Sequence, residues 1–323
     1  MIKMVLKRLG QTILSLVVVA TIIFFMFRLM PGDPTAAVVD PSISTEAREA
    51  MIQRLGLDQP LYQQYFSFLS DAVRGDLGRS FYYRRPVMEV IGDKVINTLM
   101  LMLSAMLIAY VIGILVGAYL AWKRGSKKEA TLISIALTFR SAPTFWVGML
   151  FIMFFSFRLG WFPHSGMRSS GYEAANTFEV FFSLDFLRHL FLPAVVAGLY
   201  FLATPLLMMR NTMLEVLGED FIEMCHAKGL KEKVILYRHA ARNALLPVVT
   251  TGALFLGQAI GGQVLIEYVF GWPGLGTEII QAAQRHDYPL AQASFLLIAL
   301  MVMIMNFLAD LLYSYLDPRI TYK

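Results

Sequence analysis

The chain has 323 residues and a formal net charge of +5, with 57% hydrophobic and 16% charged residues. A soluble domain has about 45–50% apolar and about 25% charged residues, so this composition excludes an ordinary soluble protein. The single cysteine, Cys225, excludes an internal disulfide and a cysteine-based metal site.

Six apolar runs follow one another along the chain, each close to the ~20 residues that cross a hydrocarbon core of about 30 Å. Backbone amides in lipid must bond within a helix or a closed barrel. Barrel strands alternate apolar and polar residues, whereas these runs are continuously apolar. We therefore predict an all-α membrane protein with six transmembrane helices, at residues 9–30, 97–122, 131–157, 189–209, 245–270 and 290–316.

Three basic residues, Lys3, Lys7 and Arg8, precede the first apolar run. It is longer than the 7–15 residue core of a secretory signal, and no small-residue cleavage pattern follows it. We therefore predict an uncleaved anchor, so that residues 1–30 hold an inner tail and the first transmembrane helix.

Residues 31–96 form a loop that is too long to be a bare connector. Turn signals such as Asp58-Gln59-Pro60 interrupt a set of apolar side chains, which predicts a small folded element on the outer, periplasmic side. The alternative is a loop that lies on the membrane surface. The apolar side chains are Leu55, Leu57, Leu61, Tyr65, Phe66, Phe68 and Leu69.

Residues 97–323 hold the other five helices and an inner loop at 210–242. With the N-terminus inside, the inner segments carry fifteen Lys and Arg residues and the two short outer loops carry four. This bias predicts that both termini are cytoplasmic. Because the basic residues flank the apolar runs, they indicate membrane topology rather than nucleic-acid binding.

Motifs for catalysis and for metal or phosphate binding are absent from the sequence. No Gly-x-x-x-x-Gly-Lys-Ser/Thr loop, His-Glu-x-x-His pair or Gly-x-Ser-x-Gly elbow occurs. The five histidines lie at or beyond the ends of the predicted helices, without metal-ligand spacing. We therefore predict a transport subunit that is not an enzyme, with no catalytic residue, cofactor or metal of its own.

The inner loop at 210–242 contains a predicted short helix, Phe221–Lys228. Asp220 and Glu223 have the spacing of a capping box, and Gly229 follows at the position of a left-handed C-terminal cap. A docking element and an ordinary surface helix both fit this pattern.

The run Asp220–Leu230, followed by Arg238–Ala240 and Arg242–Pro247, resembles the signature loop of ABC importer permeases, and most closely that of the peptide/nickel branch. Glu223 and Gly229 match the signature in spacing. Four further motifs resemble that branch, so that the resemblance covers essentially the whole chain: Pro31–Pro34, Gly75–Gly78, Gly271–Gly276 and Asp317–Arg319.

The resemblance departs from the general signature at Met224 and Cys225, which replace two alanines. It implies a type I ABC importer permease in a bacterial or archaeal cytoplasmic membrane. Its partners would be a second permease, two ATPase subunits that bind ATP and Mg²⁺, and an extracytoplasmic binding protein. Peptides, nickel chelates, glutathione, and opine or sugar conjugates remain possible substrates. The residues that would couple to the ATPase are Asp220, Glu223, Ala227, Lys228 and Gly229.

Four of the polar residues within predicted helices are candidates for the pathway: Arg140, Gln258, Gln263 and Asn306. The alternative for Gln258, Gln263 and Asn306 is hydrogen bonding between helices. Arg140 lies about 13 Å into the third predicted helix, where a charge costs about 2.5–3.5 kcal/mol. We favour a pathway role for it, facing a substrate carboxylate or an acidic group of the partner permease. The alternative is snorkelling towards the inner headgroups. An ion-coupled secondary transporter is the rival function, but mid-membrane carboxylates are not seen.

Overall fold

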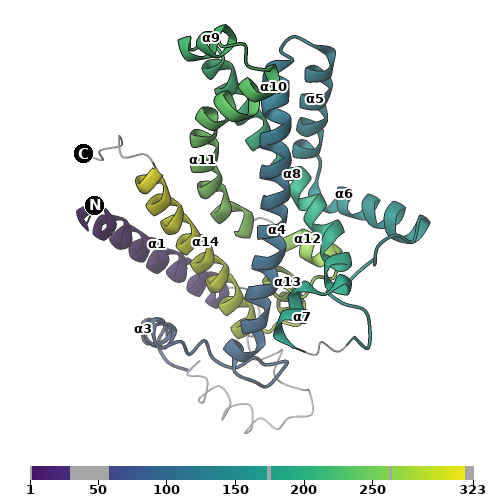
Figure 1. Ribbon diagram of the computed structural model, residues 1–323. Coiled ribbons are helices and arrows are strands. Elements are labelled where there is room, and N and C mark those ends of the chain that lie inside the picture. The colour runs from purple at the N-terminus through teal and green to yellow at the C-terminus, as the bar shows by residue number, and fades with distance from the viewer. Residues whose placement is uncertain (1, 30–57, 173–175, 262–263, 317–323) are drawn as a thin grey trace. The chain divides into compact units, whose positions relative to one another are not determined.

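The computed structural model describes residues 2–29, 58–172, 176–261 and 264–316 (Figure 1). Every regular element in those ranges is helical, and Arg79 and Pro86 form an isolated β-bridge. The predicted all-α fold is therefore confirmed. The motifs Pro31–Pro34 and Asp317–Arg319 lie outside the described residues.

The α-helices are α1 (Ile2–Arg28), α3 (Leu61–Val73), α4 (Val87–Trp122), α5 (Lys127–Ser141), α6 (Thr144–Phe151), α7 (Thr177–Phe182), α8 (Leu184–Val216), α9 (Asp220–Ala227), α10 (Glu232–Val234), α11 (Ala241–Gly261), α12 (Val264–Val269), α13 (Leu275–Gln284) and α14 (Tyr288–Leu316). Two π-helices, η1 (Ile152–Arg158) and η2 (Ile235–Ala240), continue α6 and α10.

Four described helices are long and apolar enough to cross a membrane: α1 from Val5, α4, α8, and α14 up to Leu311. A fifth span results if the bent pair formed by α5 and α6–η1 counts as one. The predicted span at 245–270 covers α11 and α12, and residues 262–263 between them lie outside the described part. A sixth span stays a prediction.

The predicted continuous helix at 131–157 is wrong. The chain bends by 105° between Ser141 and Thr144 (Figure 1). Pro143 disfavours helical geometry at the residue before it, and Ala142 is extended, with φ −71° and ψ 140°. Consequently Arg140 lies in the last turn of α5 instead of inside a longer helix.

The described chain divides into two compact units, Met1–Thr98 with Pro273–Ile304, and Leu99–Trp272 with Met305–Lys323. In the first unit, α3 of the outer loop packs against α1. Phe24 is fully buried, and its ring centroid lies 5.4 Å from that of Tyr65 and 5.6 Å from that of Phe68. Tyr65 and Phe68 are thus partly buried against α1, whereas Phe66 is 65% exposed.

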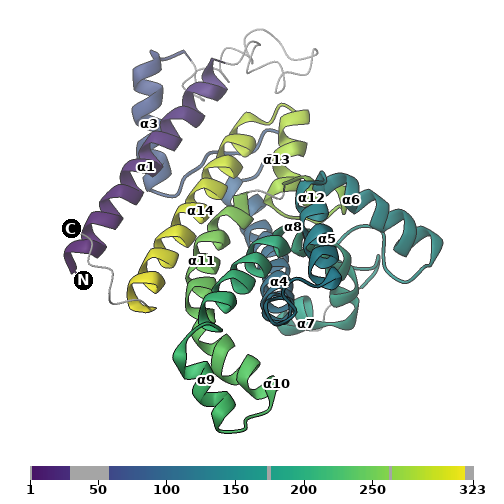
Figure 2. The same cartoon turned by 90° about the horizontal axis from the view of Figure 1, so that it is seen from above.

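In the second unit, α4, α5 and α11 pack around α8 (Figures 1 and 2). Two glycines of α4 let the α8 backbone approach closely. A Cβ on Gly113 would come within 2.8 Å of Pro205 Cγ, and one on Gly117 within 2.5 Å of the Leu206 carbonyl oxygen. Small residues four apart on a helix allow such backbone approach, and here they fix α4 against α8.

Candidate functional site

Helix α9 ends in the left-handed cap that the sequence predicts. Gly229 has a φ of +70°. Its N–H donates to the carbonyl of His226 at 2.9 Å, and the N–H of Leu230 donates to the carbonyl of Cys225 at 3.3 Å. These two bonds form a Schellman motif, which satisfies carbonyls that would otherwise lack partners.

The N-terminus of α9 differs from the predicted capping box. Asp220 is the first helical residue, and Glu219 occupies the N-cap position without a side-chain hydrogen bond to the backbone. Asp220 is the first residue with helical geometry, so it is not at the N-cap position, from which a side chain accepts a hydrogen bond from the first backbone N–H groups. Asp220 and Glu223 still lie in the first turn, where negative charge interacts favourably with the helix dipole.

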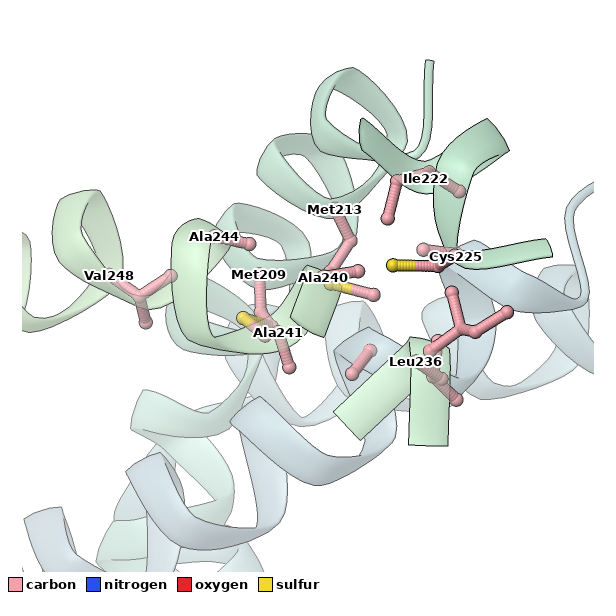
Figure 3. Packing of buried hydrophobic residues seen from close by; sticks show 12 residues of the cluster. Met209, Met213, Ile222, Cys225, Leu236, Ala240, Ala241, Ala244 and Val248 are labelled. Atoms are coloured by element: carbon pink, nitrogen blue, oxygen red, sulfur yellow. The ribbon is translucent and has the colours of Figure 1, made fainter. Parts of the chain in front are cut away.

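One face of α9 is anchored to the second unit. Ile222 and Cys225 are buried among apolar side chains of α8, η2 and α11 (Figure 3). The cluster includes Met209 and Met213 of α8 together with Leu236, Ala240, Ala241, Ala244 and Val248. Helix α9 therefore packs on residues of both α8 and α11.

The opposite face of α9 is exposed. Met224 is 58% exposed, and Asp220, Glu223, Ala227, Lys228 and Gly229 are also exposed. This face offers two carboxylates, a thioether and small groups on a helix whose other face is packed. Such a surface can bind a partner protein without rearranging the fold.

An ion pair between α5 and α8 was not predicted from the sequence. Arg210 of α8 donates from Nε and Nη2 to Glu129 Oε1 of α5, at 2.8 and 2.6 Å. The other Glu129 oxygen accepts the Gly125 N–H at 2.6 Å, and Ser126 Oγ accepts the Glu129 N–H at 3.2 Å. The Ser-x-x-Glu capping-box spacing was the available signal. The pair ties α5 to α8 just before the chain enters α9.

The pathway candidates lie in different places. The Arg140 guanidinium carbon is 4.4 Å from the centroid of the Tyr200 ring on α8. Asn306 is exposed on α14. Gln258 belongs to α11, but the placement of its side chain is not described, and Gln263 lies outside the described residues. Only Arg140 therefore has a described setting that bears on a pathway.

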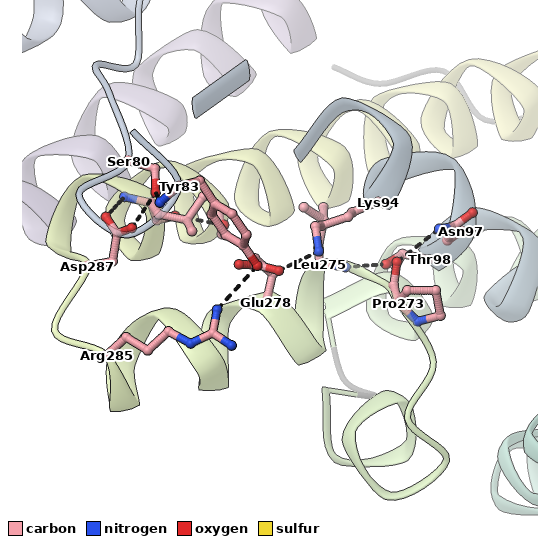
Figure 4. A network of polar contacts seen from close by, with 12 residues as sticks. Ser80, Tyr83, Lys94, Asn97, Thr98, Pro273, Leu275, Glu278, Arg285 and Asp287 are labelled. Carbon is pink, nitrogen blue, oxygen red and sulfur yellow. Dashed lines mark hydrogen bonds and ion pairs between the residues drawn. The ribbon is translucent and has the colours of Figure 1, made fainter. Parts of the chain in front are cut away.

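In the first unit, Asp287 lies just before α14 and binds residues 80–82 (Figure 4). The Asp287 carboxylate accepts hydrogen bonds from Ser80 Oγ and from the N–H groups of Phe81, at 3.1 Å, and Tyr82, at 3.0 Å. Asp287 is only 1% exposed. This long-range contact has no signature in the sequence.

The segment that begins α13 is fixed to α4 by a second set of polar contacts (Figure 4). Lys94 pairs with the buried Glu278, and Asn97 Nδ2 donates to the Pro273 carbonyl at 2.9 Å. Arg285 stacks on Tyr82 at 3.9 Å and donates to the hydroxyl of Tyr83, a hydrogen bond that raises the pKa of Arg285. The Gly271–Gly276 motif thus leads into α13, which these contacts hold against α4.

Among the described residues, no group of three or more His, Cys, Asp or Glu side chains could hold a metal ion. The described residues form an arrangement of helices in which α9 is short, capped at its C-terminal end and exposed on one face.

Comparison with known proteins gives two family matches that together cover most of the chain. Residues 109–322 match the family described as "Binding-protein-dependent transport system inner membrane component". Residues 1–102 match the N-terminal part of such membrane components.

Several relatives match over nearly their whole length. The chain is 40% identical to the di/tripeptide transport system permease protein DppB of Pseudomonas aeruginosa, over 100% of both chains. It is 39% identical to the oligopeptide transport system permease protein AppB of Bacillus subtilis, over 97% of this chain and 95% of AppB. It is 35% identical to the glutathione transport system permease protein GsiC of Escherichia coli, over 100% of both.

Among solved structures, the MetNI methionine ABC transporter in an inward-facing conformation matches with a TM-score of 0.54 and 20% identity. The match covers 71% of this chain and 97% of the transporter chain. At this identity the likeness concerns the fold.

Proposed function

Since the chain belongs to the family of binding-protein-dependent transport system inner membrane components, we propose that it forms half of the translocation pathway of an importer for short peptides. It is a permease subunit of an ABC importer, a multi-pass inner membrane protein, and not itself an enzyme. The observation that carries the substrate class is its full-length 40% identity to a di/tripeptide permease.

The substrates named for the relatives have one chemistry in common. Di- and tripeptides, oligopeptides and glutathione are all short chains with amide bonds and free carboxylates. We therefore propose short peptides ahead of nickel chelates and of opine or sugar conjugates.

The proposed coupling element is α9. Its exposed residues Asp220, Glu223, Ala227, Lys228 and Gly229 would dock on a cytoplasmic ATPase subunit, which binds ATP and Mg²⁺. The burial of Ile222 and Cys225 supports this role, because a helix that transmits force has to be seated firmly. The Schellman cap at Gly229 adds further rigidity.

The proposed assembly contains a second permease, two ATPase subunits and an extracytoplasmic binding protein. Residues 1–30 would form the inner tail and first span, 31–96 the outer element, and 97–323 the remaining spans with the coupling loop at 210–242. The excess of Lys and Arg in the inner segments supports cytoplasmic termini.

The test is uptake of radiolabelled dialanine into proteoliposomes that contain the whole complex, with the binding protein outside. We expect uptake that needs ATP inside and stops when any one subunit is omitted. Uptake by this chain alone, driven by a proton or sodium gradient without ATP, would contradict the proposal and favour a secondary transporter.

A further inference from the structure

We propose that residues 79–86 and the end of α13 at residues 283–286 form a surface, here called the arginine–tyrosine surface, on which an acidic face of the extracytoplasmic binding protein docks. The inference rests on the proposed function, because the binding protein and the outer location of both segments come from there.

The first observation is the charge of the two segments. Residues 79–86 contain Arg79, Arg84 and Arg85, residues 283–286 contain Arg285, and neither segment contains an acidic residue. All four arginines are exposed. Arg85 pairs with Glu89 at 3.1 Å, and the other three form no ion pair within the part of the chain that the structure describes. The surface is therefore cationic.

The second observation is the way tyrosines frame one of these arginines. The Arg285 guanidinium lies 3.9 Å from the centroid of the Tyr82 ring and donates from Nη1 to the Tyr83 hydroxyl at 3.2 Å (Figure 4). The two tyrosine rings meet edge to face at 4.9 Å, and Tyr82 is 57% exposed. Arginine and tyrosine are among the residue types that contribute most binding energy at protein interfaces.

The third observation is that the surface has a defined conformation without a partner. Asp287 holds residues 80–82 through their side-chain and backbone donors (Figure 4). Within residues 79–86, the Ser80 N–H donates to the Arg85 carbonyl and the Arg84 N–H to the Ser80 carbonyl, both at 3.0 Å. A partner that binds here has little loop to order, which favours affinity.

The fourth observation is backbone strain in both segments. Arg84 has a φ of +55° and His286 a φ of +56°. Residues other than glycine are uncommon in this region, and strained residues cluster at functional sites. Glycine would adopt the same conformation at position 84 without strain. The needs of the fold alone therefore do not explain an arginine there.

The chemistry of the surface favours the binding protein over two other occupants. A permanent interface with the second permease would be more hydrophobic. An anionic lipid surface attracts any basic segment through its charge, so a fixed arrangement of side chains gains nothing there. The binding protein has to associate and dissociate in each transport cycle, which suits a rigid and charged surface, and opposite charge on its docking face would speed the encounter.

The experiment titrates dialanine-loaded binding protein onto the complete complex in nanodiscs and measures the Kd. The variants are Arg285→Glu, Tyr82→Ala and Arg84→Gly. The matched control is Arg74→Glu, at an exposed arginine directly after α3. We expect the Kd to rise about tenfold for Arg285→Glu and Tyr82→Ala and about threefold for Arg84→Gly, and to stay unchanged for the control. The affinity of the unaltered complex should fall as salt is raised.

Arg84→Gly separates docking from a structural role, because it removes a charge and relieves strain at the same time. A purely structural role predicts an unchanged Kd with equal or higher thermal stability, whereas docking predicts a higher Kd with equal or higher stability. An unchanged Kd in both Arg84→Gly and Arg285→Glu overturns the inference, as does an equal loss of affinity in Arg74→Glu.

The other occupants give results of their own. An unchanged Kd together with loss of bound phosphatidylglycerol in Arg285→Glu overturns the inference in favour of a lipid site. An unchanged Kd together with loss of complex yield overturns it in favour of a contact with the second permease. Failure of the unaltered complex to take up dialanine is a different result, which removes the proposed function and with it the partner named here.

Discussion

Replacing Gly229 tests whether the capped end of α9 matters for coupling. The residue has a φ of +70°, and a Cβ there would meet nothing within 4 Å. A substitution therefore acts through backbone conformation alone, without a clash. The left-handed conformation costs a non-glycine residue about 1–2 kcal/mol. It costs asparagine less and β-branched residues more.

The alternative for the variant is to leave that conformation and lose the two bonds of the Schellman motif. Either way the capped helix becomes less populated. A cost of about 1–2 kcal/mol corresponds to about 5–30-fold weaker binding of a partner that needs the capped form. We expect affinity for the ATPase subunits to fall in the order Gly, Asn, Ala, Val at position 229.

The assay is titration of the purified ATPase subunits onto the permease pair in nanodiscs. Gly218→Ala is the matched control, because Gly218 also flanks α9, lies outside the left-handed region, and would bring a Cβ only to ordinary contact at 3.4 Å from the Glu215 carbonyl oxygen. Equal affinity for the Gly229→Val variant and the unaltered chain, or an equal loss in Gly218→Ala, would refute the reasoning.

Three further predictions concern other parts of the chain. Arg210→Met should lower stability by about 1–3 kcal/mol, because it leaves the buried Glu129 carboxylate without its guanidinium partner. Glu129→Gln should cost less, because the Arg210 side chain is 24% exposed and keeps water contacts. The double variant should lose less than the sum, and thermal unfolding in detergent measures this. Gly117→Ala should lower the yield of folded protein, since its Cβ would lie 2.5 Å from the Leu206 carbonyl oxygen, whereas Gly92→Ala in the same helix should not. The purified chain alone should neither bind nor hydrolyse ATP, and hydrolysis by the isolated subunit would contradict its assignment as a transport subunit.

The parts of the fold that were predicted from the sequence have local causes. Long apolar runs require helices in lipid, so the large helices and their order followed directly. Gly229 was predicted as a left-handed cap because only glycine adopts that conformation without strain. The close packing of α4 on α8 at Gly113 and Gly117 is consistent with the packing of small residues four apart on a helix.

The parts that were missed depend on competing or long-range effects. The apolar run at 131–157 favoured one continuous helix, so the bend after Ser141, next to Pro143, was not predicted. Helix α4 begins at Val87, ten residues before the predicted start at Asn97. The apolar run placed the predicted start too late, because the first turns of the helix carry the charged residues Glu89, Asp93 and Lys94. The contacts of Asp287 with residues 80–82 join segments more than two hundred positions apart, and no local pattern announces them.

We propose that α9 is the surface through which a conformational change of the ATPase subunits is transmitted to the membrane helices. Cross-linking from a cysteine introduced at position 224 tests it most directly, because Met224 is 58% exposed and the native Cys225 is buried. With Met224→Cys in the assembled complex, we predict that a short thiol-reactive cross-linker joins this chain to the ATPase subunit, and that the chain with Met224 unchanged gives no product. An intact, active complex in which position 224 never cross-links to the ATPase would contradict the account.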